Sequence, residues 1–168
     1  MADSKAHKYV AVTAALGATA YIAKEQKGLD FWLQLLGSTL GALCTGNLPD
    51  IFEPAVSSCH WSTFHSISAG AAIGSQTNGI LGVREFCYGQ AEQCRENPRR
   101  ILEVPLAEGV SLPLELNGTV GLTLSLIERC LWLLVAGFAV GAATGYVSHL
   151  ALDAVTCKRP LPLLTKGL

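Results

Sequence analysis

Long apolar stretches that are almost free of charged residues dominate the pattern of this chain. Their length and spacing predict helices over residues 9–23, 31–47, 66–83 and 130–151, with a shorter amphipathic helix over 119–128. Alternating apolar and polar positions, which would indicate strands, are scarce, and no hairpin turn signal separates strand-like runs. The pattern therefore predicts an all-α bundle of about four apolar helices.

The last of these stretches has the length of a membrane span. The run from Leu131 to Leu150 contains no charged residue, and about 20 apolar residues are enough to cross a bilayer as a helix. Its small residues suit close packing against other helices; they are Ala136, Gly137, Gly141, Ala142 and Gly145. We expect the apolar helices to form a transmembrane bundle in contact with membrane lipid. The alternative is a soluble bundle whose helices are apolar because they fill its core.

The N-terminal stretch has a second interpretation. Two lysines precede an apolar run that ends in Ala18-Thr19-Ala20, which resembles the small-residue cleavage site of a signal peptide. Polar and glycine positions interrupt the run, so we favour a helix that stays in the protein.

A polar segment over residues 84–118 separates the third and fourth apolar stretches. Its Asn97-Pro98 and Leu112-Pro113 steps disfavour a continuous helix, so we predict an exposed insertion with one short helix. The length of 168 residues is typical of one domain, which we expect to cover residues 1–168.

Composition narrows the classes of function. Hydrophobic residues make up 50% of the chain and charged residues 15%, which excludes a disordered or collagen-like protein. The 12 basic and 13 acidic residues give a formal net charge of -1, and the one dense basic group is Arg95, Arg99 and Arg100. Binding to nucleic acid is not predicted, because it requires a concentrated positive surface.

The six cysteines lack the close spacing of a zinc ribbon. Cys44 and Cys130 lie in apolar runs and are expected in the core. Cys87 and Cys94 flank a predicted polar loop and could form a disulfide if that loop faces an oxidising compartment.

The four histidines lie near the ends of the apolar stretches. If successive helices run in alternating directions, these ends meet at one end of the bundle, where three carboxylates of the sequence also arrive. Imidazole and carboxylate groups are common ligands of zinc and other divalent metals. The candidate metal ligands are therefore His7, Asp50, His60, His65, His149 and Asp153, with Glu53 beside them.

Two local features support a site at this end. His149 and Asp153 are four residues apart, which places both side chains on one face of a helix. Asp50 follows Leu48-Pro49, where the proline fixes the backbone and leaves the carboxylate at a rigid turn. The alternative is structural: Asp50 caps a helix, the two middle histidines lie at an interface, and His149 hydrogen-bonds to Asp153.

Three sequence blocks resemble a known family. They are Leu48-Pro49-Asp50-Ile51, the run from His60 to Ser66 (HWSTFHS), and the run from Gly145 to Asp153 (GYVSHLALD) with Thr156 and Pro160 after it. They are similar to the LPDIDHP, HRGxTHS and GYxSHxxxD blocks of the LexA-regulated, inner-membrane, metal-dependent hydrolases. That family also has a histidine ahead of its first apolar helix, which His7 matches. The order and spacing of the blocks carry the resemblance more than any single one.

The resemblance implies a metal-dependent hydrolase of the bacterial inner membrane. The family's arrangement is in turn similar to the all-α zinc phospholipase C and P1 nuclease class, where an HxxxD pair contributes zinc ligands. It implies that the six candidate ligands hold one to three divalent ions, with zinc as the first choice and manganese or iron as alternatives. A metal-activated water would attack an ester, in the first place a phosphoester or lipid, with Asp50 or Glu53 as general base.

The chain departs from the family pattern in two of the blocks, in ways that affect turnover. Phe52-Glu53 stands where the family has Asp-His, and Trp61 stands where it has an arginine that could bind an anionic substrate. Glu53 can replace a ligand, whereas Phe52 cannot. The alternative function is therefore a non-catalytic membrane protein that retains a degenerate site for metal binding, transport or assembly.

Overall fold

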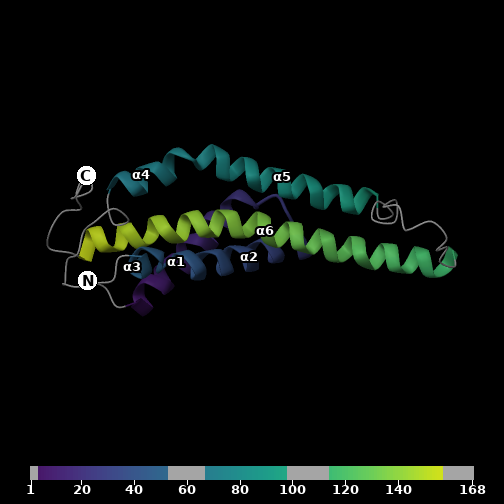
Figure 1. The fold of residues 1–168 in the computed structure, drawn as a ribbon, viewed down its shortest axis with the longest axis horizontal. Helices are drawn as coiled ribbons and strands as arrows, with labels where there is room; N and C mark the ends of the chain where they lie inside the picture. The colour runs from purple at the N-terminus through teal and green to yellow at the C-terminus, as the bar shows by residue number, and fades with distance from the viewer. Residues whose placement is uncertain (1–3, 53–66, 98–113, 157–168) are drawn as a thin grey trace.

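Every regular element that the structure describes is a helix. The structure is a computed structural model that describes residues 4–52, 67–97 and 114–156 (Figure 1). Its helices are α1 (Ser4–Ile22), α2 (Leu29–Thr45), α3 (Leu48–Phe52), α4 (Ile67–Ser75), α5 (Thr77–Glu96) and α6 (Leu114–Thr156). The prediction of an all-α fold is confirmed for this part of the chain.

Helix α6 is the axis along which α1, α2 and α5 pack (Figure 1). The chain reverses between α1 and α2 at Gly28, whose φ of 62° lies in the left-handed region that glycine adopts freely. The two helices are antiparallel, and a hydrogen bond of 2.8 Å from Thr19 Oγ1 to Ser38 Oγ joins them in the core. Helix α2 then runs parallel to α6. The long limb formed by α4 and α5 returns antiparallel along the other side of α6 (Figure 1).

Small residues let α2 and α6 touch backbone to backbone. A Cβ atom added to Gly141 would lie 2.0 Å from the carbonyl oxygen of Ser38, and one added to Gly137 would lie 2.0 Å from that of Gln34. The hydroxyl of Thr45 bridges the same helices by donating to the carbonyl oxygen of Ala142 at 2.7 Å. The small residues predicted to allow close helix packing on α6 therefore have a specific partner, which is α2.

The prediction of an exposed insertion over residues 84–118 is wrong for the parts that the structure describes. Residues 84–96 belong to α5 and residues 114–118 begin α6, whereas residues 98–113 lie outside the described part. One side of α5 packs against the bundle, with Arg84, Cys87, Ala91 and Cys94 buried on it. The predicted helix over 119–128 is likewise the first part of α6 rather than a separate element.

The positions of the cysteines also differ from the prediction. Cys87 and Cys94 are buried on α5, and seven helical residues place them about 10 Å apart, which is too far for a disulfide between them. Cys44 is exposed on α2 and Cys130 is intermediate, so neither is a fully buried core residue.

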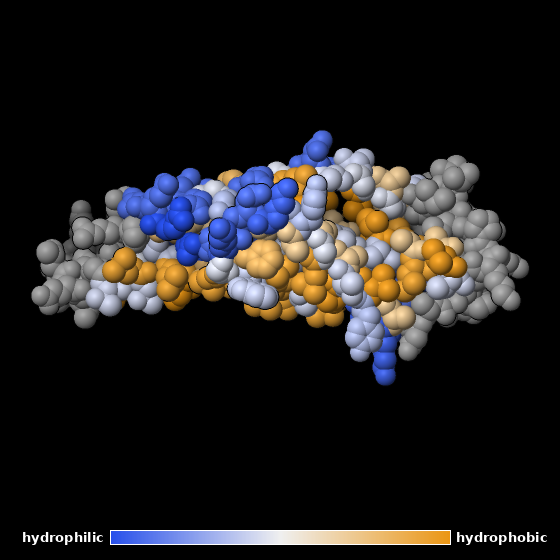
Figure 2. Space-filling view, turned by 180° about the vertical axis from the view of Figure 1, so that it is seen from behind, coloured by the Kyte–Doolittle hydropathy of each residue, from blue (hydrophilic) through white to orange (hydrophobic). Residues whose placement is uncertain are grey.

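Of the described helices, α6 alone is long and apolar enough to cross a membrane, over Thr119–Thr156, so the expectation of about four such helices is too high. Helix α4 has only 9 residues, α2 has 17, and α5 carries several charged residues. The surface of the bundle is nevertheless rich in large apolar side chains, which cover much of the face shown in Figure 2 while hydrophilic ones gather along one edge. On α2 and α6 they include Trp32, Leu36, Leu40, Leu124, Ile127, Leu131, Val135 and Phe138.

Candidate metal centre

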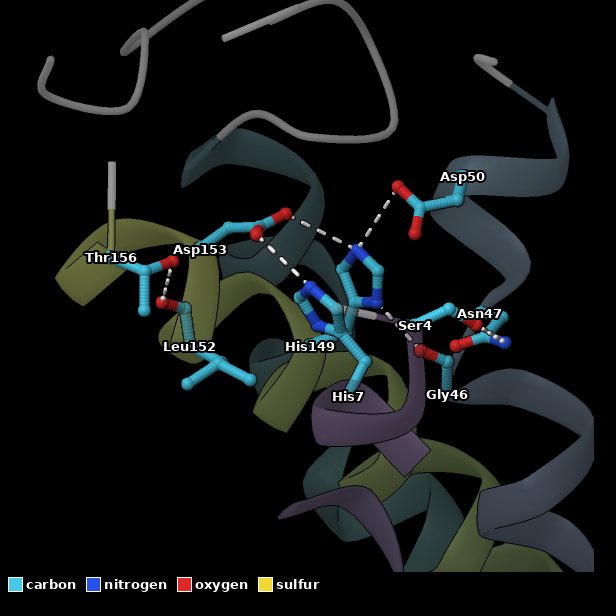
Figure 3. A network of polar contacts seen from close by, with 9 residues as sticks. All are labelled: Ser4, His7, Gly46, Asn47, Asp50, His149, Leu152, Asp153 and Thr156. Carbon is cyan, nitrogen blue, oxygen red and sulfur yellow. Dashed lines mark hydrogen bonds and ion pairs between the residues drawn. The ribbon is translucent and has the colours of Figure 1, made fainter. Parts of the chain in front are cut away.

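Four of the predicted ligands meet at one end of the bundle. The first turns of α1 supply His7, the short α3 supplies Asp50, and the last turns of α6 supply His149 and Asp153 (Figure 3). These residues meet because α1 starts, and α3 and α6 end, on the same side of the molecule (Figure 1).

The carboxylate of Asp153 bridges the Nε2 atoms of the two imidazole rings. Its Oδ2 is 3.2 Å from Nε2 of His149, and its Oδ1 is 3.2 Å from Nε2 of His7. Oδ1 of Asp50 approaches the same Nε2 of His149 from the other side at 3.6 Å (Figure 3). The two rings stack with their centroids 4.0 Å apart and their planes inclined by 24°. Nitrogen and oxygen atoms from three helices therefore face one small volume.

A backbone carbonyl fixes the orientation of His149. Its Nδ1 lies 2.6 Å from the carbonyl oxygen of Gly46, and a carbonyl oxygen can only accept a hydrogen bond. Nδ1 therefore carries the proton and donates it. In the neutral ring this leaves Nε2, which faces Asp50 and Asp153, with a free lone pair. Metal-binding histidines are commonly held in this way, by a hydrogen bond from the ring nitrogen that does not bind the metal.

The local sequence explains how Gly46 reaches this position. A Cβ atom at Gly46 would lie 2.7 Å from the carbonyl oxygen of Ala42 and 2.9 Å from Cβ of Ala11, so a larger residue would push α1 and α2 apart. Pro49 follows in the first turn of α3, where its missing N–H costs no hydrogen bond. Asn47 donates to the hydroxyl of Ser4 at 3.2 Å and joins this turn to the start of α1.

Burial makes the cluster sensitive to charge. His7 and His149 are fully buried, and Asp153 is 1% exposed, whereas the side chain of Asp50 is 24% exposed. With both rings neutral, the two carboxylates bring two negative charges into this space, which is unfavourable without a cation. Protonating both rings would supply positive charge, but it would also place two cations face to face at 4.0 Å. One divalent ion shared by the cluster avoids that repulsion.

The donor set and its spacing fit such an ion. Ligand atoms from His7, Asp50 and His149 all lie within 4.8 Å of one another. Atoms bound to one tetrahedral zinc ion at ~2.1 Å are about 3.4 Å apart, which is close to the 3.2 and 3.6 Å around Nε2 of His149. Nδ1 of His7 is buried without a hydrogen-bond partner among the described residues, so no hydrogen bond there competes with an ion for this nitrogen. The residues present are therefore compatible with a mixed histidine and carboxylate metal site.

The other predicted site residues cannot be placed. Glu53, His60 and His65 lie outside the described residues, and so does Trp61. Phe52, which stands at a position where the resembled family has a polar residue, is 60% exposed at the end of α3.

Gly46 is the functional residue that sequence reasoning missed. Its contribution is a backbone oxygen, which no side-chain pattern reveals. The available signal was its place just ahead of the Leu48-Pro49-Asp50 block, where a glycine allows close approach of two helices.

Comparison of the chain with protein-family models, curated proteins and solved structures gives no match. The family resemblance therefore rests on the sequence blocks themselves.

Proposed function

We propose that this protein is a membrane-associated, metal-dependent hydrolase that acts on an ester or phosphoester. The observation that carries the proposal is the cluster of two imidazoles and two carboxylates from α1, α3 and α6, in which His7, His149 and Asp153 are buried and Asp50 is partly exposed. Groups of this kind are costly to bury together, and a divalent cation is the ligand that makes the arrangement favourable.

The exposure of each residue suggests its role, either as a metal ligand or as the general base. His7, His149 and Asp153 are buried and would hold the ion, for which zinc suits the nitrogen and oxygen donors best and manganese or iron are alternatives. When bound, such an ion lowers the pKa of a coordinated water towards about 7 and stabilises developing negative charge. Asp50 is the most exposed carboxylate of the four residues, so it can accept the proton of the attacking water as a general base.

Charged residues at two levels of the bundle support a position across a membrane. Arg129 of α6 forms an ion pair with Asp30 at the start of α2, and the metal centre lies where both helices end. From Arg129 to Asp153 a helix rises about 36 Å, slightly more than the ~30 Å hydrocarbon core of a bilayer. Exposed apolar side chains of α2 and α6 lie between these levels, including Leu36, Leu40, Leu131, Val135 and Phe138. The candidate centre would then lie at one membrane surface, in a bacterial inner membrane if the family resemblance holds.

The alternative function is a membrane protein that binds metal without turnover. Phe52 favours it, because a phenyl side chain at the end of α3 adds no ligand beside Asp50.

The first experiment is elemental analysis of the protein purified in detergent without chelators. We expect about one or more equivalents of zinc or another divalent metal in the wild-type protein, and a loss of that metal in a His149→Ala, Asp153→Ala double variant. Ser38→Ala is the matched control, because it removes a buried polar group from α2 far from the cluster and should leave the metal content unchanged. Metal-free wild-type protein would refute the proposal.

A second measurement separates the two functions. The metal-loaded protein and the double variant are assayed side by side on aryl phosphomonoesters, phosphodiesters and carboxylic esters. The hydrolase predicts turnover that is lost in the variant. Stoichiometric metal without turnover on any ester class would instead favour the non-catalytic function.

A further inference from the structure

Two apolar cavities lie on either side of α6, where the junction between α4 and α5 faces this helix. The larger cavity, of about 590 Å³, lies between α2, the α4–α5 limb and α6, and the smaller one, of about 330 Å³, lies on the side of α1. The limb contacts α6 near its far end, where Ser125 donates to the carbonyl oxygen of Cys94 and the rings of Phe86 and Trp132 meet. It contacts α6 again at the α4 end, where Gly70 packs against Leu150. Near the junction, small side chains such as Ala139 and Ala142 leave the space open.

The larger cavity offers a ligand almost no hydrogen bonds. Most of its lining is aliphatic, including Leu48, Ile73, Ile80 and Val83. The hydroxyl of Thr45 donates within the protein, to the carbonyl oxygens of Gly41 and Ala142 at 3.0 and 2.7 Å. A chain of methylene groups, which needs no polar partner, matches this lining.

The larger cavity also adjoins the metal centre. Thr45 and Leu48 of its lining stand on either side of Gly46 and Asn47, and Gly46 holds the ring of His149. Tyr146 of the lining precedes His149 by less than one turn of α6. From Ala139 at the far side of the cavity to His149, α6 rises about 15 Å, so the whole cavity lies within the reach of one elongated molecule from the centre.

We propose that the larger cavity holds the hydrocarbon chain of a lipid whose ester or phosphoester head lies at the His7, Asp50, His149 and Asp153 cluster. The substrate class is therefore an amphiphile taken from the membrane, rather than a water-soluble ester. The assignment of the head as the cleaved group rests on the proposed function, whereas binding of the chain does not.

Photocrosslinking tests the inference. The full-length protein is placed in phosphatidylcholine and phosphatidylglycerol vesicles that contain a phospholipid with a diazirine near the end of one acyl chain. Gly79→Phe places a phenyl ring in the larger cavity, where an added Cβ would meet only the Gln76 side chain, at 3.7 Å. Gly89→Phe is the matched control, because it makes the same change on α5, in open space and away from both cavities.

We expect wild type and Gly89→Phe to form crosslinks that map by mass spectrometry to residues 73–83 and 139–146. In Gly79→Phe these crosslinks should fall roughly tenfold, since the ring excludes several methylene groups. Crosslinks to the outward-facing Trp32 and Leu36 report on surrounding lipid and should stay constant. Equal yields at the cavity in both variants, or wild-type crosslinks confined to outward-facing residues, would overturn the inference.

Metal analysis of the same samples distinguishes this inference from the proposed function. Metal-free protein with crosslinks in the cavity would refute the hydrolase and leave the lipid site standing. Metal-loaded protein without crosslinks in the cavity would do the reverse. If both hold, Gly79→Phe should keep its metal and its activity on short-chain esters while it loses activity on long-chain lipids.

Discussion

At the scale of single residues, one backbone oxygen decides what His149 can do. The carbonyl oxygen of Gly46 accepts a hydrogen bond from Nδ1–H, which leaves the lone pair of Nε2 for a metal ion, on the side of the ring that faces the two carboxylates. The side chain thus has two separate roles: one nitrogen holds the ring and the other faces the ligand volume.

Two substitutions at His149 separate these roles. Asparagine can place an amide N–H where Nδ1 lies and keep the bond to Gly46, but it has no atom at the position of Nε2. Glutamine reaches the Nε2 position and loses that bond. We expect His149→Asn to lower metal affinity by at least about 100-fold. In the metal-free state it should retain about 1 kcal/mol more stability than His149→Gln.

Titration calorimetry with zinc and urea unfolding of the metal-free proteins check these values. Metal binding of wild-type strength in His149→Asn would show that Nε2 is not a ligand.

At the scale of helices, the contact between α2 and α6 holds the cluster in register. Gly37, Gly41, Gly137, Gly141 and Gly145 give the two backbones a close and parallel approach. The contact continues directly into the turn at Gly46 and into His149, so a change in helix separation moves two sides of the metal centre.

A single methyl group on this contact should be destabilising. Gly141→Ala would place Cβ 2.0 Å from the carbonyl oxygen of Ser38, which forces the helices apart and costs roughly 1–3 kcal/mol of unfolding free energy. Gly82→Ala on α5 is the matched control, because its Cβ meets nothing within 4 Å. It should instead gain about 0.5–1 kcal/mol from helix propensity.

Denaturant unfolding in detergent measures both variants. Equal stability of Gly141→Ala and Gly82→Ala would contradict the close contact.

The sequence predicted the helical class and brought His7 to the same end of the bundle as His149 and Asp153. The predicted helix boundaries were wrong where a charged residue forms an ion pair, as in α6. They were also wrong where charged residues alternate with the buried face of a helix, as in α5. Arg129 reads as a break between two helices, but α6 continues through it, and its side chain forms an ion pair with Asp30 of α2. The charged residues of α5 read as a loop, although Cys87, Ala91 and Cys94 follow the spacing of one helix face. Periodicity shows which residues share a face but not which charges find partners.

At the scale of the whole molecule, a bound ion should act as a staple between the helices. The cluster joins α1, α3 and α6, so an ion that binds only the folded protein stabilises it by mass action. At about 100 times its dissociation constant, this amounts to ~2.7 kcal/mol.

Chelation should therefore lower the melting temperature by roughly 5–10 °C in a protein of this size. Differential scanning fluorimetry in detergent, with and without EDTA, measures the shift, and re-addition of zinc should reverse it. His149→Asn should melt at the same temperature in both conditions. A wild-type melting temperature that is indifferent to EDTA would argue against the staple.

The apolar surface predicts that the protein partitions into the membrane rather than into the soluble fraction. We expect the wild-type protein to stay in the membrane pellet after an alkaline carbonate wash, because α6 is free of charge from Cys130 to Leu152. Two arginines at the outward-facing positions Val135 and Phe138 should each cost about 3 kcal/mol of insertion and release part of the protein. Wild-type protein in the soluble fraction would contradict a membrane span.

The parallel course of α2 and α6 also determines when the centre can form during synthesis. Gly46 and His149 are 103 residues apart, so the ribosome makes the first half of the centre long before the second. During that interval α1 and α2 can already associate through Thr19 and Ser38, which satisfy one another without α6. The set of candidate ligands is complete only after the ribosome has synthesised α4, α5 and then α6. If the cluster binds an ion, its occupancy therefore reports that α1, α2 and α6 have assembled.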